Sequence, residues 1–514
     1  MTHWPTRSFS CIASFGPKLP FIACSFHPSK TKLYLRYSTT IAAIRGPYNY
    51  INQQDKNNFY DILKHKSRLL DDQDVSNYVA DWHGYYHNNT RNFTHIALRP
   101  TTTQMVAAIM KHCYKRNLAV VPQGGNTGLV GGGTPVFDEI VLSTSLMDDI
   151  INFDPQSGIL ICQAGCILKN LQDYVGNYGF TMPIDLGARG SCQIGGNLST
   201  NAGGIHFVRY GPLRRYVTGV EVVLSNGVVL DMITPQPMQD SDFKQLFIGA
   251  EGTLAILTKV AIKCVETAKC YSAIMLGCKT HHQVTSVLMD ARNVLGHTVS
   301  AIEVMDSAAV SVVNSKLGLK CPLSPHPFYA LIETFSNDED QNIDKLSHIL
   351  SLLENKFGSM ESAVSLNQTQ LSQLWSVREH ITEALKRDGH VYKFDISVPI
   401  AKYFDLVDVM RHEIGSYSST ICGFGHLADG NLHLNITSKQ YDKLLLNRIE
   451  TILCDWLVQN GGSISAEHGI GFHKAHLMHG SKSSNSLAMM RSIKAHFDPK
   501  VSKANVRALK QFIT

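Results

Sequence analysis

The chain has 514 residues, of which 44% are hydrophobic and 17% charged, a composition typical of a globular protein with two or three domains. No run of 18 or more apolar residues occurs, so we expect no transmembrane segment. The twelve cysteines are scattered without a CxxC pair, which indicates reduced thiols and argues against a disulfide framework.

The net charge of +5 comes from the N-terminal end. Six of the 47 basic residues lie in residues 1–45, which are rich in Ser and Thr, and the first acidic residue is Asp55. A basic leader without acids is typical of a mitochondrial transit peptide, so we predict one over 1–45 and a place in the mitochondrial matrix. The alternative is a disordered tail. The remaining 41 basic and 42 acidic residues give no charge pattern for binding nucleic acid.

An α+β region follows an N-terminal preamble over 46–91 and covers residues 92–268. HIALRP predicts a strand, residues 101–117 a helix with an N-terminal Thr cap, and LAVVPQGG a buried strand that leads into glycines. Further strands are predicted in EIVLST, GILICQAG, GVEVVLSNGVVLD and TLAILTKVAIKC. The SNG step at 225–227 predicts a hairpin turn.

The pattern changes in residues 269–455, which we interpret as a second, substrate-binding domain. Helices are expected over 344–357 and 371–389, and strands in FYALIETF and VYKFDISVPI. A C-terminal helical segment, 456–514, contains SISAEHGIG.

Two glycine-dense loops indicate a dinucleotide site. VPQGGNTGLVGGG has six glycines from Gly124 to Gly133, and DLGARGSCQIGGNLSTNAGG follows later. Such density is expected where the backbone approaches a ligand, and exposed N–H groups can hold a pyrophosphate. The alternative is a pair of flexible surface loops. No GxGxxG opens a helix after a strand, which disfavours a nicotinamide cofactor.

Five motifs in order resemble the vanillyl-alcohol oxidase superfamily, and within it the D-lactate/D-2-hydroxyglutarate dehydrogenase branch. They are VPQGGNTG, PIDLGARGSCQIGGNLSTNAGG, FIGAEGTLAILT, GFGHLADGNLHLN and SAEHGIG. The resemblance implies an α+β fold: a two-lobed, PCMH-type FAD-binding domain, then an α+β substrate (cap) domain and the helical C-terminal segment.

The resemblance also implies the residues that line FAD. Relatives with covalent flavin carry a His where this chain has Asn126, so we expect non-covalent FAD. The full set is Gly124, Gly125, Asn126, Thr127, Gly128, Gly187, Ser191, Gly195, Gly196, Asn201, Gly203, Gly204 and Ile256.

His426 and His433 flank the turn LADGNL between two expected strands, and Glu467 lies far along the chain. By spacing alone, structural histidines are favoured. The resemblance implies instead that all three bind a metal, and this ligand chemistry suits Zn²⁺. Zinc lowers the pKa of a bound hydroxyl, and His468 can then accept its proton.

Four further residues are candidates for substrate binding. Arg378 and Thr382 lie four apart in an expected helix and share one face, and Asn435 lies two residues beyond His433 in a strand. Singly, each would be read as a surface group. The resemblance implies that these residues and Lys393 bind D-2-hydroxyglutarate, because a second carboxylate needs a second cation. It also implies electron-transfer flavoprotein as the electron acceptor.

Two alternatives remain open: an FAD-dependent D-lactate dehydrogenase, disfavoured by Lys393, and a catalytically impaired protein that binds flavin or zinc. The second is supported by two departures from the family pattern, in residues 231–245 and in the tail after Lys500. The same flavin fold hosts an alkyl-glycerone-phosphate transferase, against which the His426, His433 and Glu467 set argues.

Overall fold

The computed structural model describes residues 45–80, 96–233 and 242–500. The predicted leader up to residue 44, most of the divergent 231–245 segment and the tail after residue 500 lie outside these ranges. Within them, no helix is both long and apolar enough to cross a membrane.

The first sheet is mixed, with strand order β1-β2-β4-β3 and parallel pairing of β2 and β3 with β4. It confirms the predicted strand–helix–strand start. Thr102 caps α4 by accepting the N–H of Met105, and α4 and α1 bury their apolar faces on this sheet. The elements are α1 (Gln53–Leu63), β1 (Leu69–Asp71), α2 (Ser76–Val79), β2 (Ile96–Leu98), α4 (Thr103–Arg116), β3 (Val120–Gln123) and β4 (Ile140–Ser143).

The second sheet is antiparallel, with strand order β5-β6-β10-β8-β9. The predicted hairpin is confirmed, because β8 and β9 pair around Gly227, whose φ is +85°. Strands β7 and β11 pair with each other and form a separate two-stranded sheet. The elements are β5 (Ile150–Asp154), β6 (Ile159–Gln163), α5 (Leu168–Gly176), β7 (Phe180–Thr181), α6 (Ile194–Thr200), α7 (Phe207–Tyr210), β8 (Val217–Val223), β9 (Val229–Met232), β10 (Ile256–Lys263) and β11 (Val265–Glu266).

The third sheet is antiparallel and has seven strands in the order β15-β12-β14-β13-β17-β18-β16. Side chains alternate between its faces, so α8, α10, α13 and α14 pack on one face and α9, α11 and α12 on the other. The elements are β12 (Cys270–Cys278), α8 (His281–Leu295), β13 (Val299–Asp306), α9 (Ser307–Leu317), β14 (Phe328–Ser336), α10 (Glu339–Phe357), β15 (Ser362–Val364), α11 (Gln368–Glu379), α12 (Ile381–Asp388), β16 (His390–Ser397), α13 (Asp405–Ile414), β17 (Ile421–His426), β18 (Asn431–Ser438), α14 (Lys443–Asn460), α15 (Met478–Ser481) and α16 (Ser484–Phe497).

The structure corrects two expectations for this part of the chain. The single helix expected over 371–389 is two helices, because the backbone leaves helical geometry at His380, whose ring nitrogen lies 2.8 Å from the carbonyl of Ser376. In addition, α14 runs through residue 455, where a domain boundary was expected, and packs in the core of the seven-stranded sheet. A loop over 461–474 then leads back toward the first two sheets.

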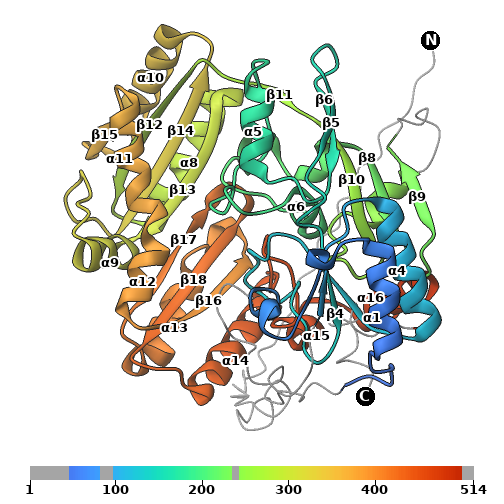
Figure 1. Ribbon diagram of the computed structural model, residues 1–514. Coiled ribbons are helices and arrows are strands. Elements are labelled where there is room, and N and C mark those ends of the chain that lie inside the picture. The colour runs from blue at the N-terminus through green and yellow to red at the C-terminus, as the bar shows by residue number, and fades with distance from the viewer. Residues whose placement is uncertain (1–44, 81–95, 234–241, 501–514) are drawn as a thin grey trace, which may run out of the picture. The chain divides into compact units, whose positions relative to one another are not determined.

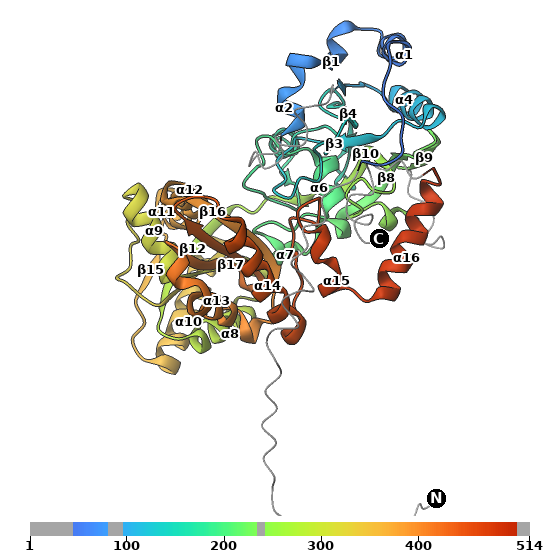
Figure 2. The same ribbon diagram turned by 90° about the horizontal axis from the view of Figure 1, so that it is seen from below.

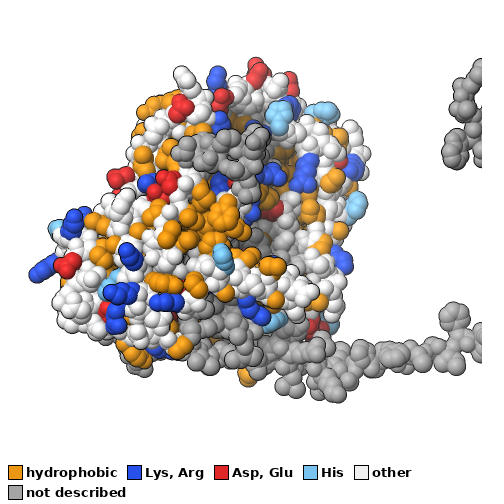
Figure 3. All heavy atoms as spheres, turned by 90° about the vertical axis from the view of Figure 1, so that its right-hand side faces the viewer, with side chains coloured by type: hydrophobic (Ala, Val, Ile, Leu, Met, Phe, Trp, Pro, Cys, Tyr) orange, Lys and Arg blue, Asp and Glu red, His pale blue; other side chains and the backbone are white. Residues whose placement is uncertain are grey.

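Figure 1 shows the seven-stranded sheet beside the elements of the first two sheets, and Figure 2 shows α7 between them, where it packs against β13. On the face shown in Figure 3, hydrophobic side chains gather near the centre and charged side chains of both signs are scattered around them. Both signs are expected from the near-neutral charge of residues 46–514.

Candidate functional site

A cavity of about 950 Å³ lies between the glycine loops and one face of the seven-stranded sheet. All but two of the predicted site residues line it. Its size fits a dinucleotide together with a small acid, because ligand sites typically have volumes of about 300–1,000 Å³. Motifs that are hundreds of residues apart in sequence therefore meet in one place, as the resemblance implies.

One wall of the cavity consists of backbone. A Cβ at Gly125 would lie 2.1 Å from the carbonyl oxygen of Ser191, and one at Gly204 would lie 2.2 Å from that of Asp185. These glycines let the two loops pack directly on each other. By contrast, a Cβ at Gly128 or Gly196 would meet no atom within 4 Å and would fill cavity space instead.

Two predicted flavin contacts, Asn201 and Gly203, are not among the lining residues of the cavity. Asn201 ends α6 in the left-handed region, with φ of +50°, and its side chain accepts the N–H of Arg214. A Cβ at Gly203 would lie 2.9 Å from the ring of Phe207. Both residues therefore contact neighbouring protein groups beside the second glycine loop and do not line the cavity.

The opposite wall is built by strand register. Lys393 on β16 pairs with Asn435 on β18, and Asp395 pairs with His433 two residues along. Because side chains alternate in a strand, all four lie on the face shared with α11 and α12. On the neighbouring strands, Glu303 of β13 pairs with His426 of β17.

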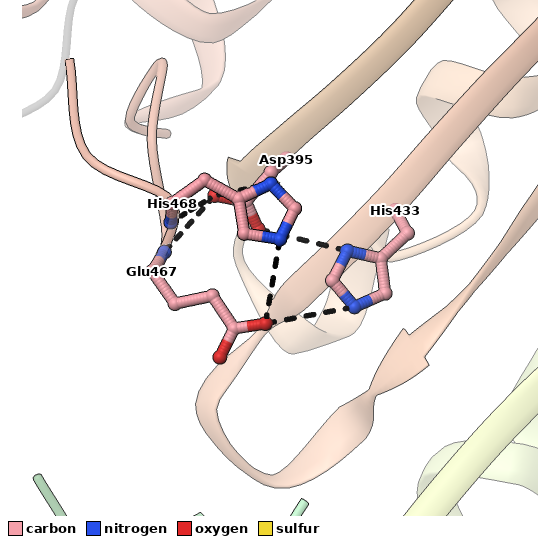
Figure 4. A group of neighbouring side chains, drawn as sticks. All are labelled: Asp395, His433, Glu467 and His468. Carbon is pink, nitrogen blue, oxygen red and sulfur yellow. Dashed lines mark hydrogen bonds and ion pairs between the residues drawn. The ribbon is translucent and has the colours of Figure 1, made fainter. Parts of the chain in front are cut away.

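Four potential ligands converge at this wall: Asp395, His433, Glu467 and His468 offer donor atoms within 4.8 Å of one another (Figure 4). Glu467 Oε1 lies 3.8 Å from Nε2 of both histidines. Its other oxygen accepts the N–H of Gly204 from the glycine wall at 3.0 Å. The loop that carries Glu467 and His468 therefore contacts both walls.

His426 lies beside this group and not within it. Its ring centroid is 5.6 Å from that of His433, and its Nε2 is 3.3 Å from Glu303 Oε1. Its Nδ1 is buried and makes no hydrogen bond within the described ranges, with Asp429 Oδ2 at 3.8 Å. Burial opposes the charge, but Glu303, Glu467 and Asp429 raise the pKa of His426 to about 9. This position thus favours a cation, either a proton or a metal.

Burial lowers the pKa of His433 well below its usual value, with a further contribution from Arg378. This shift favours the neutral imidazole, the form that coordinates metals. Burial alone would raise the pKa of Asp395, but His468, Lys474 and His433 together lower it, so this carboxyl is ionised.

The predicted substrate cations differ in their surroundings. Arg378 Nε donates to Glu303 Oε2 at 2.6 Å, which leaves its terminal amino groups for a ligand. The side-chain ammonium of Lys393 has no hydrogen bond or ion pair with any residue that the structure describes, and burial and the nearby Lys386 lower its pKa to about 8. Thr382 also lines the cavity, and the Oδ1 of Asn435 is buried without a hydrogen-bond partner in the described part of the chain.

Comparison with known proteins places this cavity in a known family. Residues 94–232 match the model described as "FAD binding domain", and residues 271–502 match "FAD linked oxidases, C-terminal domain". The mitochondrial D-2-hydroxyglutarate dehydrogenase of Bos taurus is 43% identical over 89% of this chain and 83% of its own length. That of Danio rerio is 44% identical over 89% and 85%.

The chain belongs to the family of FAD-linked D-2-hydroxyglutarate dehydrogenases. It is thus an FAD-dependent oxidoreductase by family. The solved structure of an alkyldihydroxyacetonephosphate synthase superposes with a TM-score of 0.69, covering 91% of this chain and 87% of that one, at 16% identity. At that identity the likeness shows the fold alone, and it confirms the predicted two-domain α+β architecture.

Three residues of this site were missed from sequence: Asp395 and Glu251, which line the cavity, and Glu303, which contacts Arg378 and His426. Each is a single carboxylate in an apolar strand or a glycine-rich turn, without a local pattern. Asp395 stands in VYKFDIS, two residues beyond the predicted Lys393 and therefore on the same strand face, and this spacing was the available signal.

Proposed function

We propose that the chain oxidises D-2-hydroxyglutarate to 2-oxoglutarate in the mitochondrial matrix and passes the electrons to electron-transfer flavoprotein. The assignment of the substrate rests on the position of Lys393. It is a partly buried cation in the same cavity as Arg378, and within the described ranges it has no anionic partner. A substrate with two carboxylates would pair with both cations, whereas lactate would leave Lys393 unpaired.

The glycine wall fits FAD. Gly128, Gly187 and Gly196 leave space that a side chain would fill, and the neighbouring backbone is positioned to contact a dinucleotide. When bound here, FAD would supply the acceptor for the hydride that leaves C2 of the substrate. Asn126 donates from its side chain to the carbonyl of Ala80. It offers no imidazole for a flavin bond, so acid precipitation should leave the yellow colour in the supernatant.

His426, His433 and Glu467 would hold the metal. The fit is supported by the buried Nδ1 of His426, which has no hydrogen-bond partner in the described part of the chain, and by Glu467 Oε1, which faces His433. Two imidazoles and one carboxylate form a donor set that suits zinc and leave a position for substrate. When bound here, zinc would supply a Lewis acid for the substrate hydroxyl and so lower its pKa.

His468 would accept the hydroxyl proton. Its ring is partly exposed to the cavity, with Nε2 3.8 Å from Glu467 Oε1 and Nδ1 3.9 Å from Asp395 Oδ2. An imidazole can act as a general base toward a hydroxyl within its reach, and both carboxylates would face the imidazolium that forms. Arg378, Thr382, Lys393 and Asn435 would hold the carboxylates and so orient C2.

Anaerobic mixing with each candidate acid tests the proposal, because reduction of the flavin bleaches its absorbance. We expect fast bleaching with D-2-hydroxyglutarate, slower bleaching with D-lactate and none with L-2-hydroxyglutarate. Faster bleaching with D-lactate would favour the lactate alternative. The absence of bleaching with all three would favour the impaired flavin-binding alternative. Reoxidation by purified electron-transfer flavoprotein tests the acceptor.

A further inference from the structure

The loop 465–471 has no regular secondary structure, yet its backbone is held at almost every residue. The N–H groups of Ala466, Glu467 and His468 all donate to one oxygen, Asp395 Oδ2, at 3.2, 3.0 and 2.9 Å. The next two donors, Ile470 and Gly471, bind the two oxygens of Glu251 at 2.8 Å each. Five backbone donors therefore bind two carboxylates.

Asp395 approaches the loop from the seven-stranded sheet. It is 2% exposed, and Lys474, which follows the loop, donates to its backbone carbonyl at 2.7 Å. Its second oxygen lies 3.6 Å from His433 Nδ1, so the Nε2 of that ring faces Glu467. Carboxylates placed behind a metal-binding histidine orient the ring without touching the ion.

Glu251 approaches the loop from the opposite side, because it precedes β10 of the second sheet. Its φ of +51° is left-handed, a conformation that is strained in residues other than glycine and persists where the surroundings impose it. Its own N–H donates to the carbonyl of Ser199 next to the glycine wall. Both oxygens of its carboxylate accept backbone N–H groups of the loop 465–471.

We propose that Asp395 and Glu251 are positioning residues, a pair of buried carboxylates that clamp the loop 465–471 and so place Glu467 and His468 against His433. Asp395 acts as the anchor of the loop and not as a metal ligand. This proposal deepens the proposed function and rests on it for the roles of Glu467 and His468. The clamp itself depends only on the hydrogen bonds above.

Hydrogen–deuterium exchange of the holoenzyme measures the protection of the backbone N–H groups in the loop 465–471 and does not depend on any reaction. In the native protein we expect slow exchange at residues 466–468 and 470–471. Asp395→Asn should release the first group and Glu251→Gln the second, each leaving the other group protected. Gly469→Ala should release the second group too, because its Cβ would lie 2.9 Å from the Glu251 carboxylate.

The same variants are then titrated with zinc and assayed. Loss of a residue that orients a metal ligand typically weakens metal binding about 10- to 100-fold, so we expect this loss for Asp395→Asn with a similar fall in kcat. Flavin content should not change. Asp306→Asn is the matched control, because Asp306 is an equally buried carboxylate that accepts the N–H of Ala309 and of Gly423 away from the loop.

The outcomes separate the two proposals. Loss of zinc affinity by Asp395→Asn with unchanged exchange at 466–468 would mean that Asp395 is itself a ligand and would overturn the clamp. Equal losses in Asp306→Asn would also overturn it, because they would reflect general destabilisation. If the native protein binds no zinc but the exchange pattern holds, the metal part of the proposed function fails and the clamp stands. Should Asp395→Asn not fold, Glu251→Gln and Gly469→Ala carry the same test.

Discussion

The two walls of the cavity differ in the chemical groups that they present to a ligand. The glycine wall presents backbone, and its residues come from a few glycine-rich stretches. The opposite wall presents charged and polar side chains from β16, β17, β18, α11, α12 and the loop 465–471, so no short stretch of sequence contains it. A backbone wall should tolerate changes of charge and pH but not added bulk, and a side-chain wall should behave in the opposite way.

The largest effect is expected on the side-chain wall, at the proposed base. His468→Asn removes the proton acceptor without changing the size of the side chain much, so kcat should fall about 10²- to 10⁴-fold. Anaerobic flavin reduction measures this directly, and the flavin absorbance spectrum before mixing should match that of the native protein. Near-normal turnover would remove the assignment of His468.

Lys393→Met should discriminate between substrates. Leaving a buried carboxylate without its cation costs about 2–5 kcal/mol, so KM for D-2-hydroxyglutarate should rise about 30-fold or more. KM for D-lactate, which has no second carboxylate, should change little. Steady-state kinetics with both acids provide the measurement. Equal effects on the two substrates would contradict the dicarboxylate assignment.

The glycine wall can be tested by replacing one of its glycines with a larger residue. A valine at position 196 would project into cavity space, and overpacking of this kind costs about 1–3 kcal/mol, so Gly196→Val should weaken FAD binding about 5- to 150-fold. Fluorescence titration of the apoprotein with FAD measures the change. Gly176→Val is the control, because a Cβ there also meets nothing within 4 Å but lies outside the cavity.

The smallest expected effect is a pH dependence specific to the side-chain wall. Burial and Lys386 lower the pKa of Lys393 to about 8, so its charge is present below that pH and lost above it. The kcat/KM for D-2-hydroxyglutarate should therefore decline above about pH 8, up to tenfold per pH unit, relative to that for D-lactate. Lys393→Arg should shift the decline beyond the accessible range, because arginine stays charged.

The sequence predicted the fold well because its signals are local. The capped helix α4, the hairpin at Gly227 and the strands β14 and β16 each depend on a few neighbouring residues, and the structure confirms them. The helix expected over 371–389 was predicted wrongly as continuous. Its helical periodicity continues across His380, whereas the backbone leaves helical geometry there, with φ of −87° and ψ of 1°.

By itself, the sequence determined the backbone wall and the identity of most chemical groups, since glycine density and the order of five motifs can be read along the chain. Only the tertiary structure decided which charges meet. Strand register placed Asp395 opposite His433 and Glu303 opposite His426, and loop packing brought Glu251 to the 465–471 segment. The physical reason is that a buried carboxylate is stabilised by distant donors, which leave no pattern next to it in sequence.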